Sequence, residues 1–250
     1  MIERLEALGR FGRFAGAVGV RLVTPPWELS AALAQLGILF RRCLLPVLAT
    51  TTPLGMVMAL QGLAIFDLYG AQRLLSPLVS VATFRELSPV LASVLVAAQG
   101  GSSYAAELGA MRIREEIDAT EVMAIDALRV HVVPRFAAVL LACPLLNFVG
   151  SLGGIVGGWI SAVLMKGEPS GIYWTNLFQL TQASDLWGGA VKALVFGTII
   201  GLTACYQGFY ATGGAPGVGR AVNDTVVLAA TSFIVANYFL TTALFGAIGG

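Results

Sequence analysis

The sequence predicts an all-α, polytopic integral membrane protein with an N-terminal interfacial helix, five transmembrane helices and a cytoplasmic helix. Of the 250 residues, 57% are hydrophobic and 12% are charged, whereas an ordinary soluble domain carries about 25% charged residues. The apolar residues gather in runs of more than 20, the length that crosses a hydrocarbon layer of about 30 Å. Most of the surface is therefore expected to face lipid. A net charge of +1 without a basic stripe argues against a nucleic-acid partner.

Five apolar runs are candidate spans, and the segment before them has a different character. Residues 1–42 hold six arginines among apolar positions, which is typical of an amphipathic helix in the membrane interface and not of a cleavable signal peptide. We interpret residues 1–250 as a single domain. The candidate spans are Cys43 to Leu68, Leu74 to Ala98, Phe136 to Met165, Leu186 to Tyr206 and Val226 to Ile248.

The basic residues outside these spans predict the orientation of the chain. Eleven Lys and Arg residues lie on the side of the N-terminus, and two, Arg73 and Lys166, lie on the opposite side. Segments rich in Lys and Arg stay in the cytoplasm. We therefore expect a cytoplasmic N-terminus and an extracytoplasmic C-terminus at Gly250.

Small residues and prolines recur inside the spans. Glycines in the third and fourth spans have G-x-x-x-G spacing, which permits close helix approach. We favour packing within one subunit, with a subunit interface as the alternative. Prolines in the spans are expected to bend or break helices and to leave carbonyls for neighbouring helices to satisfy. The glycines are Gly150, Gly153, Gly154, Gly157, Gly158, Gly197 and Gly201, and the prolines are Pro46, Pro53, Pro77, Pro89 and Pro144.

The longest polar connection, residues 99–135, contains a predicted helix at 105–125, where there is no proline and only one internal glycine. Its pattern is amphipathic, with polar and apolar residues on neighbouring faces. Two interpretations remain open at this point: a solvated helix lying on the membrane, or a docking element for a cytoplasmic partner. The polar face would hold Arg114, Asp118 and Glu121, and the apolar stripe Ile113, Ile117 and Ala124.

Three ionisable side chains lie deep inside predicted spans: Arg85 and Glu86 in the second, and Lys192 in the fourth. A charge at the bilayer centre costs a few kcal/mol or more, so it must face protein or water and often marks a substrate path. Arg85 and Glu86 are consecutive and point about 100° apart, but Lys192 could meet Glu86. The alternative is a pair that only holds two helices together. His131, at a membrane boundary, has no triad partners and is interpreted as an ordinary interfacial residue.

The chain has no G-x-x-x-x-G-K-[ST] loop, and its three cysteines have no metal-binding spacing. We therefore expect no cofactor on this chain and no ATP hydrolysis by it. If transport is driven by ATP, a separate polypeptide must bind the ATP and magnesium. An ion-coupled secondary transporter is the alternative, with Glu86 and Lys192 as a relay, although the five unequal spans show no internal repeat. An intramembrane enzyme would need a catalytic constellation that is not evident.

Several segments resemble the MlaE/YrbE family of ABC transporter permeases, which serve lipid transport systems containing MCE-domain proteins. The resemblance covers residues 45–245 and is most specific in the central block. The chain departs from the family at Gln99, where an arginine often stands. The segments are Phe84 to Pro89, Ala106 to Arg112, Glu115 to Met123, Val133 to Arg135, Asp185 to Trp187 with Lys192, and Ala204 to Tyr206 with Gly213 to Gly219, the last being similar to the YrbE permeases of Mce systems.

The resemblance implies a multi-pass permease of the bacterial cytoplasmic membrane. It would pair with an identical or paralogous second permease and with an ATPase dimer in the cytoplasm, and it would exchange lipid with periplasmic MCE-domain proteins. The family's lipid cavity corresponds to Met58, Ile65, Phe66, Tyr69, Arg85, Glu86, Leu87 and Lys192. The ATPase-coupling helix corresponds to residues 107–123, including Glu107, Met111, Arg114, Glu115, Glu116, Asp118 and Glu121.

Overall fold

The computed structural model describes residues 2–26, 28–177 and 179–246, and all the regular structure in these segments is helical. Five helical runs in this part of the chain are long and apolar enough to cross a membrane: Leu29–Leu68, Gln72–Ile113, Leu128–Met165, Ala183–Phe209 and Gly214–Phe245. The predicted all-α, polytopic fold is thus confirmed. The expected end of the last span at Ile248, and Gly250, lie outside the described residues.

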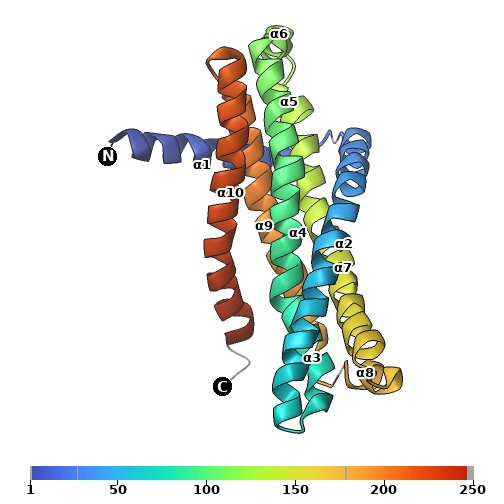
Figure 1. Ribbon diagram of the computed structural model, residues 1–250. Helices are drawn as coiled ribbons and strands as arrows, with labels where there is room; N and C mark the ends of the chain where they lie inside the picture. Colours follow the sequence, from blue (N-terminus) through green and yellow to red (C-terminus); the bar gives the residue numbers. More distant parts are fainter. Residues whose placement is uncertain (1, 27, 178, 247–250) are drawn as a thin grey trace. The chain divides into compact units, whose positions relative to one another are not determined.

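The elements follow one another along the chain as labelled in Figure 1. Short π-helical or 3₁₀ turns (η1–η5) join several of the helices without interrupting the run. The order is α1 (Ile2–Val23), α2 (Leu29–Leu68), η1 (Gln72–Leu74), α3 (Leu75–Ala82), η2 (Thr83–Leu87), α4 (Ser88–Val96), η3 (Ala97–Gly101), α5 (Ser102–Ile113), α6 (Glu116–Val122), η4 (Leu128–Val132), α7 (Val133–Trp159), η5 (Ile160–Met165), α8 (Ser170–Leu177), α9 (Ala183–Phe209) and α10 (Gly214–Phe245).

The helix ends differ from the expected ones in two places. The region 1–42 is not one interfacial segment, because α1 ends at Val23 and α2 already begins at Leu29. Pro25 and Pro26 separate them, and proline disfavours helix in the residue before it. The arginines at 41 and 42 do not stop α2, since arginine is a good helix former and its long side chain can carry the charge toward polar surroundings.

The helix expected at 105–125 is divided in the structure. Helix α5 continues directly from the preceding span and ends at Ile113, and α6 begins at Glu116. Between them Glu115 has φ 60°, a left-handed conformation that is uncommon for a residue other than glycine. The proposed common face of Arg114, Asp118 and Glu121 is therefore wrong, because the helix breaks within it.

The chain forms two compact units, each assembled from three segments. Unit 1 comprises Met1–Phe40, Val96–Ala142 and Gly197–Phe233, and unit 2 comprises Arg41–Leu95, Cys143–Phe196 and Ile234–Gly250.

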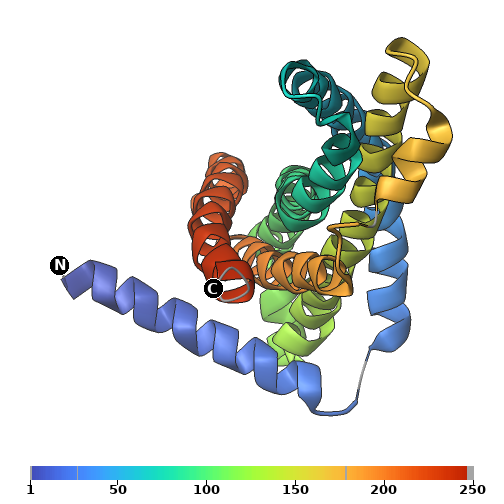
Figure 2. The same cartoon turned by 90° about the horizontal axis from the view of Figure 1, so that it is seen from below.

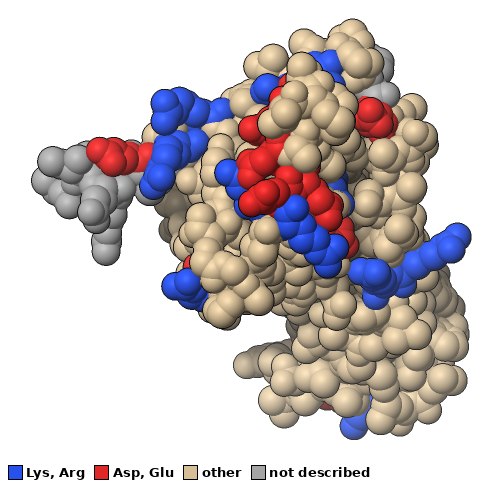
Figure 3. Space-filling view, turned by 90° about the horizontal axis from the view of Figure 1, so that it is seen from above, with Lys and Arg blue, Asp and Glu red and all other residues tan. Residues whose placement is uncertain are grey.

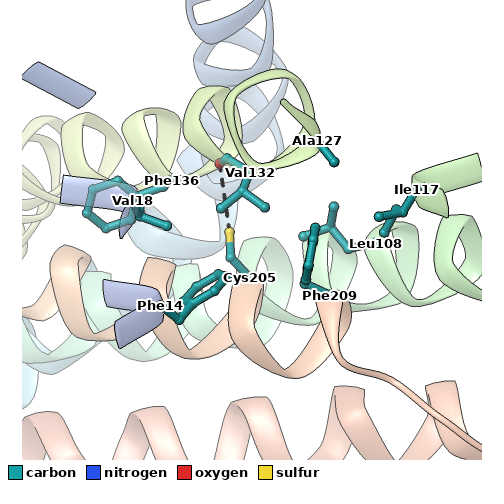
Figure 4. Close-up of a cluster of buried hydrophobic side chains, with 9 residues drawn as sticks. All are labelled: Phe14, Val18, Leu108, Ile117, Ala127, Val132, Phe136, Cys205 and Phe209. Carbon is teal, nitrogen blue, oxygen red and sulfur yellow. Dashed lines mark hydrogen bonds between the residues drawn. The ribbon is translucent and has the colours of Figure 1, made fainter. Parts of the chain in front are cut away.

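In unit 1, α1 lies across the C-terminal part of α9 (Figure 1) and contributes Phe14 and Val18 to a buried apolar cluster. The two side chains are four residues apart and therefore share one helix face. Figure 4 shows them with Phe209 from α9 and with Ile117 from α6, which lies beside Leu108. In the same cluster the Cys205 thiol lies 4.0 Å from the carbonyl oxygen of Val132. This cluster fixes α1 and α6 to the helix ends of unit 1.

An ion pair also holds the end of α1. The Arg21 Nε donates to Asp126 Oδ2 at 2.5 Å. Burial alone would raise the pKa of Asp126, but the hydrogen bond and charge of Arg21, together with the backbone N–H of Arg129, hold that pKa below its ordinary value. The contact therefore stabilises the fold above the ordinary pKa of aspartate, and this contribution is lost as the pH falls through the lowered value.

In unit 2, the glycines of α7 allow close backbone approach to α2. A Cβ on Gly157 would lie 2.0 Å from the carbonyl oxygen of Thr52, and one on Gly55 would lie 2.1 Å from that of Gly154. The favoured interpretation of the G-x-x-x-G spacing in the third span, packing within one subunit, is confirmed for these positions. Helices α2 and α7 continue through Pro46, Pro53 and Pro144 without a break.

Helix α8 packs beside α3 in the same unit (Figures 1 and 2). The Tyr173 hydroxyl donates to the carbonyl of Ile155 at 3.1 Å, and the Ser80 hydroxyl lies 3.0 Å from the carbonyl of Leu177. Buried hydroxyls thus satisfy backbone carbonyls between helices, as expected where no water is available.

Candidate functional site

Lys192 on α9 is completely buried and makes three polar contacts in unit 2. Its Nζ donates to Glu86 Oε1 at 2.8 Å, to the carbonyl oxygen of Arg85 at 2.8 Å and to Thr241 Oγ1 at 2.6 Å. An ammonium group has three N–H donors, so these contacts satisfy all of them. The expected meeting of Lys192 with Glu86 is confirmed.

Local backbone structure explains why the Arg85 carbonyl is available. Arg85 lies in the π-helical turn η2, and four residues later Pro89 has no N–H to donate to this carbonyl. Lys192 supplies the missing donor. This is the compensation by a neighbouring helix that the prolines in the spans predict.

Two residues of α10, which the sequence analysis did not identify, complete the surroundings of Glu86. Asn237 Nδ2 donates to Glu86 Oε2 at 3.0 Å. The Thr241 hydroxyl lies 2.9 Å from Glu86 Oε1 and 2.8 Å from the Asn237 carbonyl, and it can donate to one of them. Their spacing of four residues places both on one face of α10, and that pattern of polar side chains in an apolar helix was the available signal.

Arg85 has a carboxylate partner of its own. Its Nη2 lies 2.7 Å from Asp185 Oδ1, and Asp185 is completely buried. The guanidinium also lies over the ring of Phe245, 4.6 Å from the ring centre, a favourable cation–π arrangement. Arg85 with Asp185 and Lys192 with Glu86 make the cluster neutral overall, and the sequence analysis missed Asp185 because it expected this residue outside the span.

The two partners of the Lys192–Glu86 ion pair differ in exposure. The side chain of Glu86 is 39% exposed, whereas that of Lys192 is 0% exposed. The pair is therefore open on the side of Glu86, where a molecule entering from outside the helices would meet the carboxylate first. A ligand that carries an anionic group could replace Glu86 as the partner of Lys192.

The apolar residues assigned to the cavity lie mainly along one stripe of α2. Met58, Ile65 and Phe66 are spaced by seven and eight residues, which places them on one helix face. Phe66 packs against the buried cluster of unit 2, while Ile65 is exposed and Tyr69 follows the helix end in an exposed position. Met58 and Leu87 are half-buried.

The segment assigned to ATPase coupling has a buried side and an exposed side. Ile117 is fully buried, and the Thr120 hydroxyl lies 3.2 Å from His131 Nε2. On the exposed side, Val122 and Met123 project from the end of α6 with 86% and 64% of their surface accessible. Acidic and basic side chains also gather at this end (Figure 3). The exposed side of the segment therefore combines apolar side chains with charged ones.

The charged residues of this segment do not all face outward. Glu107 pairs with the buried Arg135 at 3.2 Å, Asp118 pairs with Arg112 at 2.5 Å, and Glu116 lies 3.7 Å from Arg114. Met111 packs against the buried cluster of unit 1. Within the described side chains, Glu115 and Glu121 are exposed and have no ion-pair partner. Glu107 and Met111 thus contact the interior of unit 1.

Comparison with known proteins places the chain in a family. The family model "Permease MlaE" matches residues 32–243. A "Probable ABC transporter permease protein" of Rickettsia bellii is 36% identical over 98% of this chain and 94% of its own length. The "Intermembrane phospholipid transport system permease protein MlaE" of Haemophilus influenzae is 32% identical over 99% and 95%, and an ABC transporter permease protein of Synechocystis is 37% identical over 81% and 77%. The chain therefore belongs to the MlaE permease family of membrane transporters.

Proposed function

We propose that this permease is the membrane subunit of an ABC-type lipid transporter, driven by a separate ATPase and exchanging lipid with MCE-domain proteins. The lipid would be a phospholipid, with fatty acids or sterols as other members of the same class. The observation that carries the proposal is the buried Lys192, whose partner Glu86 is open to an incoming ligand. The Haemophilus influenzae relative is named as a phospholipid transport permease, which supports the choice of phospholipid.

The cluster around Lys192 suits a lipid with an anionic headgroup. Without lipid, Glu86 neutralises Lys192, so the ammonium need not be buried alone. A phosphate oxygen arriving from the exposed side of Glu86 would take over that contact, and Asn237 and Thr241 would hold the released carboxylate. The stripe of Met58, Ile65 and Phe66, with Leu87 and the exposed Tyr69, would line the acyl chains. Arg85 would remain paired with Asp185 and position the backbone carbonyl that binds Lys192.

The proposed function is tested by reconstitution of the complete transporter in proteoliposomes. Labelled phospholipid should reach an acceptor MCE-domain protein, or leave it, only when the ATPase subunit and ATP-magnesium are both present. No nucleotide or metal is expected on this chain itself. Transfer that follows an imposed proton or sodium gradient without ATP would support the alternative, an ion-coupled secondary transporter in which Glu86 and Lys192 form a relay.

The end of α6 is proposed as the surface that docks the ATPase. Val122 and Met123 are exposed apolar side chains, and Glu115 and Glu121 are charges without an ion-pair partner among the described side chains. Exposed apolar patches with a polar rim are typical of protein interfaces. In this proposal Ile117 and Thr120 transmit the position of α6 to the buried cluster of unit 1.

Reversing the charge at Glu116 and Glu121 is expected to lower the recovery of the ATPase with the purified permease by about tenfold. Each exposed charge at an interface rim changes affinity modestly, and two reversals add repulsion to the loss of attraction. The measurement is the ratio of ATPase to permease after affinity purification. The control is the double reversal of Arg73 and Lys166, exposed charges in the connections that the sequence predicts on the opposite side.

Accessibility of α6 provides the second arm of this experiment. The bias of eleven to two in basic residues leads us to propose that α6 and the N-terminus are cytoplasmic and the C-terminus extracytoplasmic. A cysteine introduced at Asp118 should then react with an impermeant thiol reagent only after the membrane is opened. Unchanged ATPase recovery in the double reversal, or labelling of position 118 from outside intact cells, would remove α6 from the ATPase interface.

A further inference from the structure

A cavity of about 670 Å³ lies in unit 1 where α1 crosses the end of α9. Arg10, Arg13 and Phe14 line it from α1, Tyr206 and Gln207 line it from α9, and Tyr210 lines it directly after the end of α9. Cavities that hold small ligands usually measure about 300–1,000 Å³. The cavity shares no residue with the Lys192 cluster. We propose that it binds the headgroup of an anionic phospholipid of the surrounding membrane.

The cavity carries two positive charges that nothing in the described structure neutralises. Arg10 and Arg13 are three residues apart and share one face of α1 with Phe14. None of the lining residues is acidic, and neither arginine has an ion-pair partner among the side chains that the structure describes. Arg21, further along the same helix, is paired with Asp126. Among the described arginines of α1, the two without an ion-pair partner are thus the two that line the cavity.

Neutral hydrogen-bond donors line the cavity together with the two arginines. The hydroxyls of Tyr206, Tyr210 and Thr212 and the amide of Gln207 make no hydrogen bond within the described residues. A phosphodiester has four oxygens that can accept hydrogen bonds, and arginine binds phosphate in bidentate geometry. The Phe14 ring packs against both tyrosines, with its centre 5.5 Å from that of the Tyr206 ring and 5.9 Å from that of the Tyr210 ring. These ring contacts help to orient the two tyrosines before a ligand arrives.

The position of the cavity favours a membrane lipid over a soluble anion. Helix α9 is long and apolar enough to span the membrane and ends at Phe209, so Tyr206 and Tyr210 lie at the level of the headgroups, where tyrosine is enriched. Val20 and Val23, later on α1, expose 63% and 73% of their surface, which suits contact with acyl chains. Basic pockets beside the ends of membrane helices are known to bind anionic headgroups.

The test uses the complete transporter in detergent, titrated with dioleoyl phosphatidylglycerol and followed by native mass spectrometry. We expect tighter binding of this lipid than of dioleoyl phosphatidylcholine, and an affinity about fivefold lower for each of R10Q and R13Q, since a basic residue near an anionic headgroup contributes a factor of that order. The double variant R10K/R13K should stay within about threefold of wild type. R73Q/K166Q, which removes the same charge elsewhere, should bind normally.

Repeating the titration in the K192A background separates this cavity from the proposed transport site. The effect of R10Q/R13Q should persist there, whether or not Lys192 binds transported lipid. Equal affinities for the two lipids, unchanged phosphatidylglycerol binding in R10Q/R13Q, or an equal loss in R73Q/K166Q would overturn the proposal. So would displacement of the lipid by an equimolar concentration of inorganic phosphate. Loss of a protein subunit from R10Q/R13Q with lipid binding unchanged would show that the cavity docks a protein instead.

Discussion

Replacing Lys192 with methionine is expected to lower ATP-dependent phospholipid transfer by about 10- to 100-fold, the range that corresponds to a lost hydrogen bond to a charged group. The change removes the lysine donor from three acceptors: Glu86 Oε1, Thr241 Oγ1 and the carbonyl oxygen of Arg85. Pro89 cannot donate to that carbonyl, so no backbone N–H four residues later replaces the lysine. The measurement is transfer of labelled phospholipid in proteoliposomes that contain the ATPase.

The same variant should be less stable, by about 2 kcal/mol. Removing one partner of a fully buried ion pair costs about 3–5 kcal/mol, but the Glu86 side chain is 39% exposed and keeps part of its hydration. Thermal unfolding in detergent measures this loss. Lys166, an exposed lysine outside the cluster, is the control, and its replacement by methionine should change neither property. A Lys192→Met protein with full transfer and unchanged unfolding would remove Lys192 from both roles.

Replacing Gly157 with alanine is expected to destabilise the protein by about 3 kcal/mol, at the upper end of the usual cost of overpacking. The added Cβ would lie 2.0 Å from the carbonyl oxygen of Thr52. This neighbour is backbone and cannot rotate away, so α2 and α7 would have to separate within unit 2. The measurements are the amount of folded protein in membranes and its unfolding temperature in detergent.

Gly37 provides a matched control for this prediction. It also lies inside a spanning helix, α2, but a Cβ there would meet no atom within 4 Å. Alanine at position 37 should be neutral or slightly stabilising, because alanine is the better helix former. If Gly157→Ala were tolerated as well as Gly37→Ala, the close contact of α2 with α7 would not be a feature of the folded protein.

The main features of the fold follow from the sequence, because hydropathy and length report directly on membrane spans. The intramembrane charges at Arg85, Glu86 and Lys192 were equally visible, since such residues are rare in apolar helices. Asn237 and Thr241 gave a weaker signal through their spacing of four residues, because neutral polar residues are common in spanning helices and only the contact with Glu86 distinguishes this pair. The residue pattern along one helix does not show which other helix its polar face contacts.

The break between α5 and α6 had no signal in the sequence. Arg114 and Glu115 are both acceptable in a helix, and neither glycine nor proline marks the turn. The left-handed conformation of Glu115 is maintained by what surrounds it: Ile117 is buried in the cluster of unit 1 and Thr120 contacts His131. Tertiary packing thus overrides local helix propensity at this position, as it also does where α2 continues past Pro46 and Pro53.

The central claim is that the charges of Lys192 and Glu86 bind the transported lipid and do more than hold helices together. The double variant Glu86→Gln with Lys192→Met tests it most directly, because it removes both charges at once and leaves no unpaired ion. The measurement is ATP-dependent phospholipid transfer by the reconstituted transporter, with unfolding temperature recorded in parallel. We predict a stability close to wild type together with transfer as low as in Lys192→Met alone. Full transfer by this double variant would contradict the claim, because a site that binds the headgroup through Lys192 could not work without that charge.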